Sequence, residues 1–511
     1  MRLLILLAGG AVLAVIALSS SARRRRPDAR FASRGDLRAL RSRASEPGRV
    51  PLGRVTSSLG VLGARRLAAP ARDSVLVLGP TGGGKTSSIL IPAILAWEGP
   101  VLAVSVKDDL VTTTSAWRRT QGPLAVIDPS GRHDGMAARF DPVTGAVDPS
   151  AARRVAASLC LGVAVSGHEA EARFWSQLAA KLLAPLLLAA HVGGVGIDQV
   201  AGWIDRRDEM VPIDLLHAAG EQRAVDALLA STQRDERQLS SVYATLEALL
   251  EPMLEQSPNP LAAPLAARRF LEEDGTLYLC APVREQRRFA PLFCAVIDEV
   301  LDHAVQRARR DGGVLDRRLL VVLDEAAAIA PIADLDVLAA TCGGQGISLV
   351  TCFQDLAQVR ARWGERTGTV LNNHRTRVLV AGLADPELAG VLGGMAGTAV
   401  DRRGREAGGA RRQIVEPAEI RELPSHSALV VSGSTPVAKL RLVPWWSQPA
   451  VADRGPRPVA SARGSLSVIG RLTAWRARSG STSAAPRSSW LACRATGRAS
   501  NSAPIDGPPQ A

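Results

Sequence analysis

The octapeptide GPTGGGKT, from Gly79 to Thr86, constrains the fold more than any other part of the chain. It follows the apolar run VLVL, whose composition is typical of a buried strand. Ser87 to Trp97 then has the composition of a helix. A strand, a glycine-rich loop and a helix in this order make up a phosphate-binding loop (P-loop). The sequence therefore predicts an α/β fold built around a nucleotide site.

Each part of the loop has an expected role in binding ATP. Glycines let backbone N–H groups surround the phosphates, and the helix N-terminus adds partial positive charge. Lys85 is expected to reach the β- and γ-phosphates, and Thr86 to hold Mg²⁺. The residues expected to contact the nucleotide are Gly79, Pro80, Thr81, Gly82, Gly83, Gly84, Lys85, Thr86 and Ser87.

A second apolar run, LLVVL, ends in the acidic pair Asp324 and Glu325. We expect Asp324 to hold Mg²⁺ through water and Glu325 to polarise the attacking water, which is the arrangement of a hydrolase. The alternative is that the pair only caps a helix and forms its first turn. The P-loop upstream favours the catalytic interpretation.

A third apolar run, ISLVTCF, is followed by Gln354. A glutamine at the end of a strand beside the phosphates can sense the γ-phosphate and transmit its loss to a neighbouring loop. The alternative is an ordinary polar strand end. We predict a catalytic, sensing role for Gln354.

Lysine is rare in this chain, with four among 62 basic residues: Lys85, Lys107, Lys181 and Lys439. A lysine retained in an arginine-rich sequence can mark a position where arginine does not serve. Lys85 fits this interpretation well and Lys107 less well, and chance retention is the alternative for the others.

The P-loop and the acidic pair are far apart in the chain, since Asp324 lies 238 positions after Thr86. Residues 148–272 have helical spacing and almost no strand signal, which predicts an all-α insertion. Strands are expected at 101–106, 124–127, 276–279, 377–380 and 429–431. The predicted order is a membrane segment (1–22), a basic linker (23–70), the first part of the α/β domain (71–147), the all-α insertion (148–272), the second part (273–446) and a disordered basic tail (447–511).

The first residues predict a membrane anchor. Leu3 to Ala22 lack charge, and Arg23 to Arg26 follow directly. About 20 apolar residues span a bilayer, and a basic cluster stays on the cytoplasmic side. A cleaved signal peptide is the alternative, but its positive charges would precede the apolar run. We expect a single-pass protein of the inner or plasma membrane with its catalytic domain in the cytoplasm.

The net charge of +13 is concentrated at the two ends of the chain. Residues 1–50 carry eleven arginines against three acidic residues, and residues 451–511 carry nine against two. The remaining residues are close to neutral. The high isoelectric point alone is therefore no argument for a DNA-binding body.

Several segments between Ser74 and Trp446 resemble the TraG/TraD-type coupling proteins, the membrane-anchored ATPases of conjugative type IV secretion. Besides the P-loop they are VLAVSVKDDL, RFWSQLAAKLLAPLLLAA, TLYLCAPVREQRRFAPLF, LLVVLDEAAAI, GISLVTCFQDLAQVRARWGERTGTVLNNHRTRVLVAG and EIRELPSHSALVVSG. The P-loop and LLVVLDEAAAI occur in RecA-like motors generally. The other segments, in this order, are specific to the family.

The resemblance implies a RecA-like domain with an all-α domain, assembled as a homo-hexamer. It also implies ATP-driven movement of single-stranded DNA with its attached relaxase towards the channel of a type IV secretion system. The region after Glu325 resembles the family segment that recognises relaxosome proteins. The roles given above carry over to the same residues, which are Lys85, Thr86, Asp324, Glu325 and Gln354.

The chain departs from the family pattern in three ways. Relatives often have two membrane helices, and one is expected here. Relatives often carry an arginine finger before the third run, whereas the turn here is Thr341 to Gln345 and has no arginine. Arg375 and Arg377 are possible substitutes, although contact with DNA or a neighbouring loop is the favoured alternative. The near-neutral body weakens the case for tight static DNA binding.

Two other functions remain open from the sequence. An FtsK-type translocase would have several membrane helices and a C-terminal winged-helix domain, whereas this chain ends in an Arg-, Ser- and Pro-rich segment. The second open function is a secretion ATPase that acts on proteins alone, or a platform that recruits protein substrates. Stimulation of ATP hydrolysis by single-stranded DNA distinguishes it from a DNA motor.

Overall fold

The computed structural model describes residues 30–456, except 43–45, 47, 56–64, 162–168, 260, 384, 386, 388–389, 391–393, 395–396 and 401–410. The predicted membrane segment and most of the predicted C-terminal tail lie outside the described residues.

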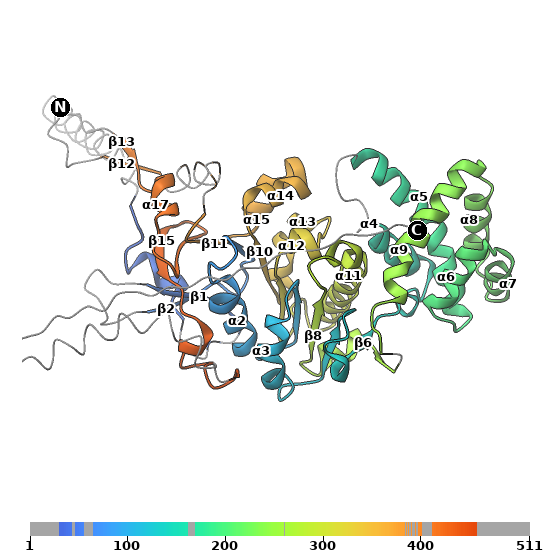
Figure 1. Cartoon of the computed structure of the whole chain (residues 1–511), viewed down its shortest axis with the longest axis horizontal. Coiled ribbons are helices and arrows are strands. Elements are labelled where there is room, and N and C mark those ends of the chain that lie inside the picture. Colours follow the sequence, from blue (N-terminus) through green and yellow to red (C-terminus); the bar gives the residue numbers. More distant parts are fainter. Residues whose placement is uncertain are drawn as a thin grey trace, which may run out of the picture. The chain divides into compact units, whose positions relative to one another are not determined.

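An eleven-stranded sheet forms the centre of the fold (Figure 1). Its order is β2-β1-β15-β14-β11-β3-β10-β9-β4-β8-β5. The strands from β11 to β5 in this order are parallel, and β14, β15, β1 and β2 pair antiparallel. Their bounds are β1 Pro51–Val55, β2 Arg66–Ala68, β3 Val75–Leu78, β4 Val101–Ser105, β5 Leu124–Ile127, β8 Thr276–Cys280, β9 Leu319–Leu323, β10 Ile347–Phe353, β11 Thr376–Val380, β14 Ser427–Ser432 and β15 Thr435–Arg441.

The strands in the parallel part are apolar because helices cover both of their faces. Every residue of β3, β4, β9 and β10 is buried. The three apolar runs of the predicted site form β3, β9 and β10. The five further strands predicted from the sequence are present as β4, β5, β8, β11 and β14. The strand β3 lies between β10 and β11, so the loop that follows it emerges in the middle of the sheet.

The two faces of the sheet belong to two hydrophobic clusters. Val75 and Val77 of β3 pack with the helices η2 and α2, whereas Leu76 and Leu78 point to the opposite face with α11. This alternation is the two-residue period of a strand. The covering helices are η2 Thr86–Leu90, α2 Ile91–Ala96, α3 Asp109–Arg118, α11 Gln286–Arg310, α12 Ala326–Ile329, α13 Leu335–Thr341, α14 Leu356–Trp363 and α15 Thr367–Asn373.

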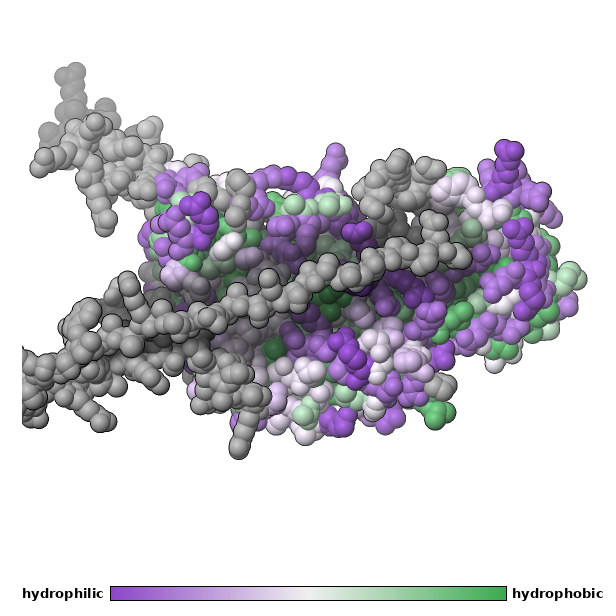
Figure 2. Space-filling view, viewed as in Figure 1, coloured by the Kyte–Doolittle hydropathy of each residue, from purple (hydrophilic) through white to green (hydrophobic). Residues whose placement is uncertain are grey.

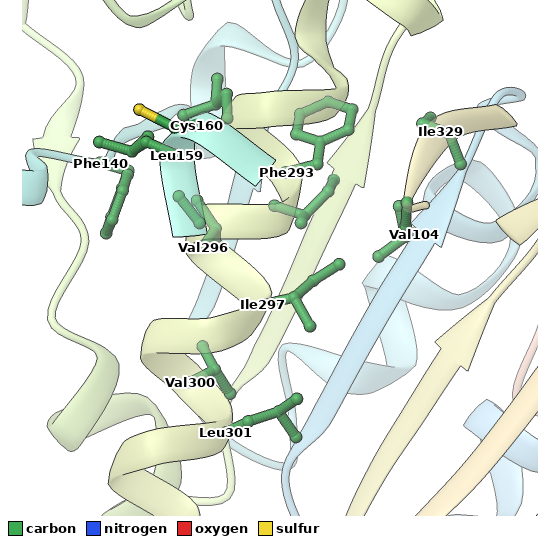
Figure 3. Close-up of a cluster of buried hydrophobic side chains, with 14 of the residues drawn as sticks. Val104, Phe140, Leu159, Cys160, Phe293, Val296, Ile297, Val300, Leu301 and Ile329 are labelled. Atoms are coloured by element: carbon green, nitrogen blue, oxygen red, sulfur yellow. The ribbon is translucent and has the colours of Figure 1, made fainter. Parts of the chain in front are cut away.

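The long helix α11 connects the sheet to the inserted helices. In Figure 3, Ile297 and Leu301 of α11 point towards the strand that carries Val104, and Val296 points towards Leu159 of α4. All of these side chains are buried. The sheet and the insertion therefore share one hydrophobic core.

The insertion consists of helices, as the sequence predicts for residues 148–272. They are α4 Pro149–Leu161, α5 Glu169–Val192, α6 Ile197–Arg206, α7 Met210–Ala218, α8 Gln222–Thr232, α9 Glu236–Leu254 and α10 Ala267–Glu272. A pair of two-residue strands, β6 Ala138–Arg139 and β7 Ala263–Pro264, joins the two ends of the insertion. Figure 2 shows many hydrophilic residues on the visible face around α8.

One inserted helix has the length and composition of a membrane span. Among the described residues, Phe174–Val192 of α5 passes that test, but 67% of its most apolar window is buried inside the protein. It packs against α4, α7, α8 and α9. This segment is therefore the central helix of the insertion.

Two predicted boundaries differ from the structure. The segment 23–70, expected to be a linker, contains η1 Asp36–Leu40 as well as β1 and β2. Its basic and small residues obscure short apolar positions such as Leu52 and Leu67, which are buried at the end of the sheet. At the other end, η7 Trp445–Ser447 and the turns up to 456 are ordered, and Val451 is buried.

The remaining elements are short. They are η3 Asp134–Met136, η4 Pro142–Gly145, η5 Cys342–Gln345, η6 Gly364–Arg366, α17 Pro417–Arg421 and the hairpin of β12 Thr398–Val400 with β13 Arg411–Gln413.

Candidate nucleotide-binding site

The P-loop connects β3 to η2 and needs its glycines for two different reasons. Gly82 and Gly84 have φ values of 81° and 90°, which favour glycine. At Gly79 and Gly83, a Cβ atom would lie 2.6 and 2.9 Å from side-chain atoms of Val380 in β11. The loop is therefore shaped by its own backbone and by close contact with the neighbouring strand.

Lys85 is buried within this loop. Its Nζ donates hydrogen bonds to the backbone carbonyls of Gly79 and of Pro80, the second at 3.2 Å. The ammonium thus lies in the mouth of the loop, where the sequence predicts the phosphates. Its charge also acts on the carboxylate of Asp324.

Asp324 follows β9 directly and contacts two hydroxyl groups. Thr86 Oγ1 lies 3.4 Å and Ser105 Oγ 3.3 Å from Asp324 Oδ2. Burial, reinforced by the charge of Glu325, raises the pKa of Asp324 to about 6, and Lys85 opposes the rise. Hard divalent cations such as Mg²⁺ prefer oxygen ligands of this kind. The donor set therefore fits the predicted Mg²⁺ site.

Glu325 and Gln354 come together at the ends of two adjacent strands. Gln354 Nε2 donates a hydrogen bond of 3.0 Å to Glu325 Oε1. Glu325 has a φ of 56°, a left-handed conformation that is costly for a residue with a side chain. The backbone N–H of Gln354 donates in turn to Gln358 Oε1. Parallel strands thus bring together residues that the sequence separates.

One cavity of about 330 Å³ collects most of the predicted site residues. Its lining consists of Pro80, Thr81, Gly82, Gly83, Gly84, Lys85, Thr86, Ser87, Ile91, Lys107, Asp109, Thr113, Asp324, Glu325, Trp445 and Trp446. Gln354 lines a neighbouring cavity, together with Pro80 and Thr81. Gly79 lies beneath the loop, against Val380.

Sequence reasoning missed several members of this site. Ser105 gave no signal, because a serine at the end of a strand is common. Lys107 was indicated only by the rarity of lysine. His426 has a φ of 61°. Its Nδ1 lies next to the P-loop, 3.5 Å from the position that a Cβ atom on Gly84 would occupy. The two tryptophans lie far along the chain and have no motif of their own.

The possible arginine fingers lie outside the P-loop cavity of their own chain, so their action on a neighbouring subunit stays a prediction. Arg377 donates a hydrogen bond through Nε to the backbone carbonyl of His374. The Nε of Arg375 lies 3.9 Å from Oδ1 of Asp73. Neither lines the cavity of the P-loop. At Gly343 a Cβ atom would lie 2.0 Å from the carbonyl oxygen of Arg72, so this turn has no room for a side chain at that position.

Comparison with solved structures identifies the fold. The plasmid coupling protein TrwB, in complex with a non-hydrolysable GTP analogue, aligns with a TM-score of 0.62 and 20% identity over 81% of this chain and 93% of that chain. TrwB in complex with ADP and Mg²⁺ aligns with a TM-score of 0.60 and 21% identity, again over 81% of this chain and 93% of that chain. These likenesses confirm the predicted RecA-like α/β core with inserted helices.

The family is shown by a comparison with family models. No curated protein sequence matches the chain. The model of type IV secretory system conjugative DNA transfer proteins matches residues 31–467, which include every described element of the site. The chain therefore belongs to the type IV secretory system conjugative DNA transfer family.

Proposed function

We propose that this protein is a membrane-anchored ATPase that couples ATP hydrolysis to the movement of single-stranded DNA, with its attached relaxase, to a type IV secretion channel. The observation that carries the proposal is the convergence of the P-loop, Asp324, Glu325 and Gln354 at one edge of the sheet. A phosphate loop alone would serve a switch or a kinase. A second carboxylate beside it supplies a base for water.

Each residue has a defined part in hydrolysis. The backbone of the P-loop and Lys85 hold the phosphates. Glu325 orients the attacking water and accepts its proton, and Gln354 holds the carboxylate of Glu325 through its amide. Since phosphoryl transfer depends mainly on positioning and charge stabilisation, these contacts provide most of what the reaction needs.

Thr86 and Asp324 are the residues that hold Mg²⁺ in this proposal. When bound, the ion neutralises charge on the β- and γ-phosphate oxygens. Ser105 keeps the carboxylate of Asp324 oriented by its hydroxyl contact. TrwB, a structural relative, has been solved with ADP and Mg²⁺ and with non-hydrolysable analogues of ATP and GTP, which supports this assignment.

The family supports the cellular role of the proposal. The matching family is that of conjugative DNA transfer by a type IV secretory system. In this proposal single-stranded DNA and the relaxosome are the cargo, and the secretion channel is the partner. Residues 1–22 would anchor the protein in the inner membrane, with the ATPase in the cytoplasm. A homo-hexameric ring would let each subunit act in turn on one strand.

The test uses the full-length protein purified in detergent. ATP hydrolysis is measured with and without single-stranded DNA, for the wild type, Glu325→Gln and the control Glu247→Gln, whose side chain is exposed on α9. We expect stimulation by DNA that Glu325→Gln abolishes and the control retains. ATP binding should survive in Glu325→Gln, since this carboxylate acts on water.

Two results would contradict parts of the proposal. Hydrolysis that single-stranded DNA does not change would redirect the function to export of protein substrates alone. A wild-type protein that binds no ATP would reject the nucleotide site itself.

A further inference from the structure

The lining of the P-loop cavity includes apolar residues that phosphate binding does not explain. Besides the loop itself, it contains Ile91, the first residue of α2, and the indoles of Trp445 and Trp446. Ile91 lies five residues after Thr86, which is roughly 7 Å along a helix. A nucleotide that places its phosphates in the loop needs a surface for its base at about this distance.

We propose that the indole of Trp446 is the stacking surface for the base of the nucleotide, and that Ile91 packs beneath it. The proposal rests on the nucleotide binding proposed above and adds the residue that holds the base. Trp446 is 37% exposed, which makes it the most exposed of the tryptophans that the structure describes. Stacking on a base would cover it.

The tryptophan is held in place by its surroundings. Trp445, the preceding residue, is buried and meets the ring of Trp446 edge to face, with centroids 5.7 Å apart and planes at 84°. Gly455 packs so closely on Trp445 that a Cβ atom there would lie 2.4 Å from the ring. The position of Trp446 is therefore fixed by a buried partner.

The turn around the two tryptophans is also tied to the helix of the site. Gln448 Nε2 donates to the carbonyl of Val443 at 2.5 Å, and Arg454 Nη1 donates to the carbonyl of Leu95 in α2 at 2.9 Å. The helix α2 continues directly from the P-loop helix η2. These bonds connect the tryptophan turn to the element that carries Thr86 and Ile91.

A stacking surface recognises the face of a base and leaves its hydrogen-bonding edge unread. The contact with Trp446 should therefore contribute equally to binding of ATP and GTP. It should contribute nothing to binding of a polyphosphate that has no base. This difference separates a base contact from a structural role in the P-loop.

The experiment measures binding of Mg-ATP, Mg-GTP and Mg-tripolyphosphate to the full-length protein by titration calorimetry. The variants are Trp446→Ala and Trp446→Phe, with Trp175→Ala as control, because Trp175 is a partly buried tryptophan on α5 that does not line the cavity. We expect Trp446→Ala to weaken both nucleotides roughly tenfold and to leave tripolyphosphate unchanged. Trp446→Phe should retain most of the affinity.

The outcomes separate this inference from the proposed function. Equal affinity of the wild type and Trp446→Ala for ATP would overturn the base contact and leave nucleotide binding intact. An equal loss for tripolyphosphate would assign Trp446 a structural role instead. A wild type that binds neither ATP nor tripolyphosphate would overturn both proposals.

Discussion

The side-chain amide of Gln354 donates a 3.0 Å hydrogen bond to Oε1 of Glu325, joining the ends of β10 and β9. A carboxylate that orients water must itself be held in one direction. Because the amide fixes one oxygen of Glu325, the other oxygen remains available to the water. The geometry thus gives Gln354 a direct connection to the predicted base.

Gln354→Ala should therefore slow hydrolysis with little effect on nucleotide affinity. We expect kcat to fall roughly tenfold or more, because the carboxylate loses its orientation, while the dissociation constant for ATP stays within a small factor. Steady-state kinetics and ATP titration measure the two quantities. The control is Gln222→Ala, which removes an exposed amide whose hydrogen bond, within the described residues, is to Asp226 in the same helix. A loss of affinity equal to the loss of rate would contradict the prediction.

The contacts of the P-loop with Val380 predict a specific rescue. Gly83→Ala would place its Cβ 2.9 Å from Val380 Cγ1, whereas Gly79→Ala would place its Cβ 2.6 Å from Val380 Cβ. Overpacking of this kind costs about 1–3 kcal/mol, so both variants should weaken ATP binding.

Adding Val380→Ala removes Cγ1 but keeps Cβ. It should therefore restore part of the ATP affinity of Gly83→Ala and little of that of Gly79→Ala. The double-mutant cycles are measured by ATP titration. Equal rescue of both glycine variants would show that the contact with Val380 does not shape the loop.

Buried Arg118 should be a major contributor to stability. Its guanidinium donates to the carbonyls of Trp97 and Gly99 and to the hydroxyl of Thr276. These bonds join α3 to the segment before β4 and to the first residue of β8. Burial lowers its pKa to about 10, so it stays charged at neutral pH.

Arg118→Met would leave these buried acceptors without a donor and should destabilise the protein by about 3 kcal/mol. Urea unfolding followed by circular dichroism measures the loss. Arg119→Ala, at the exposed neighbouring position, should change the unfolding free energy by less than about 0.5 kcal/mol. Similar losses in the two variants would contradict the role of Arg118.

His374 should make stability depend on pH. Its Nδ1 donates to the carbonyl of Val370 and its Nε2 accepts from the hydroxyl of Thr351, both at 2.7 Å. Burial lowers the pKa of His374 to about 4. An unfolded histidine, with a pKa of about 6.5, binds a proton first, so stability falls as the pH drops from about 6.5 towards 4.

Between pH 7.5 and 5.5, His374 should lower the free energy of unfolding by about 1.4 kcal/mol. His374→Asn should remove this pH-dependent loss. Urea unfolding at several pH values measures the difference. His303 is the control of opposite sign, because Glu299 raises its pKa and its contribution is lost as the pH rises. Solvent screening reduces the stabilisation from the His303–Glu299 pair, since the side chain of His303 is one-third exposed. An unchanged pH slope in His374→Asn would refute the assignment.

The sequence predicted the parts of the site that lie on buried parallel strands. Strands such as β9 and β10 are apolar along their whole length, so the polar residue after each one marks the edge of the sheet. This is why Asp324 and Gln354 could be placed from the sequence. The roles assigned to them stay predictions.

The sequence could not place the parts that depend on distant pairing. β1 contains arginine, glycine and proline, and it becomes a strand because β15 offers an unpaired edge. Trp446 reaches the nucleotide cavity only because the β14–β15 hairpin carries it there. No local pattern records such contacts, since they exist only in the completed sheet.

The position of β3 between β10 and β11 sets the order in which the protein can mature during synthesis. The strand before the P-loop is made early, but its first hydrogen-bonding partner begins at Ile347. At roughly 5–20 residues per second, the ribosome needs on the order of tens of seconds to reach that partner. Until then β3 has no strand to pair with, and Val380 of β11, which contacts the glycines of the P-loop, is made later still.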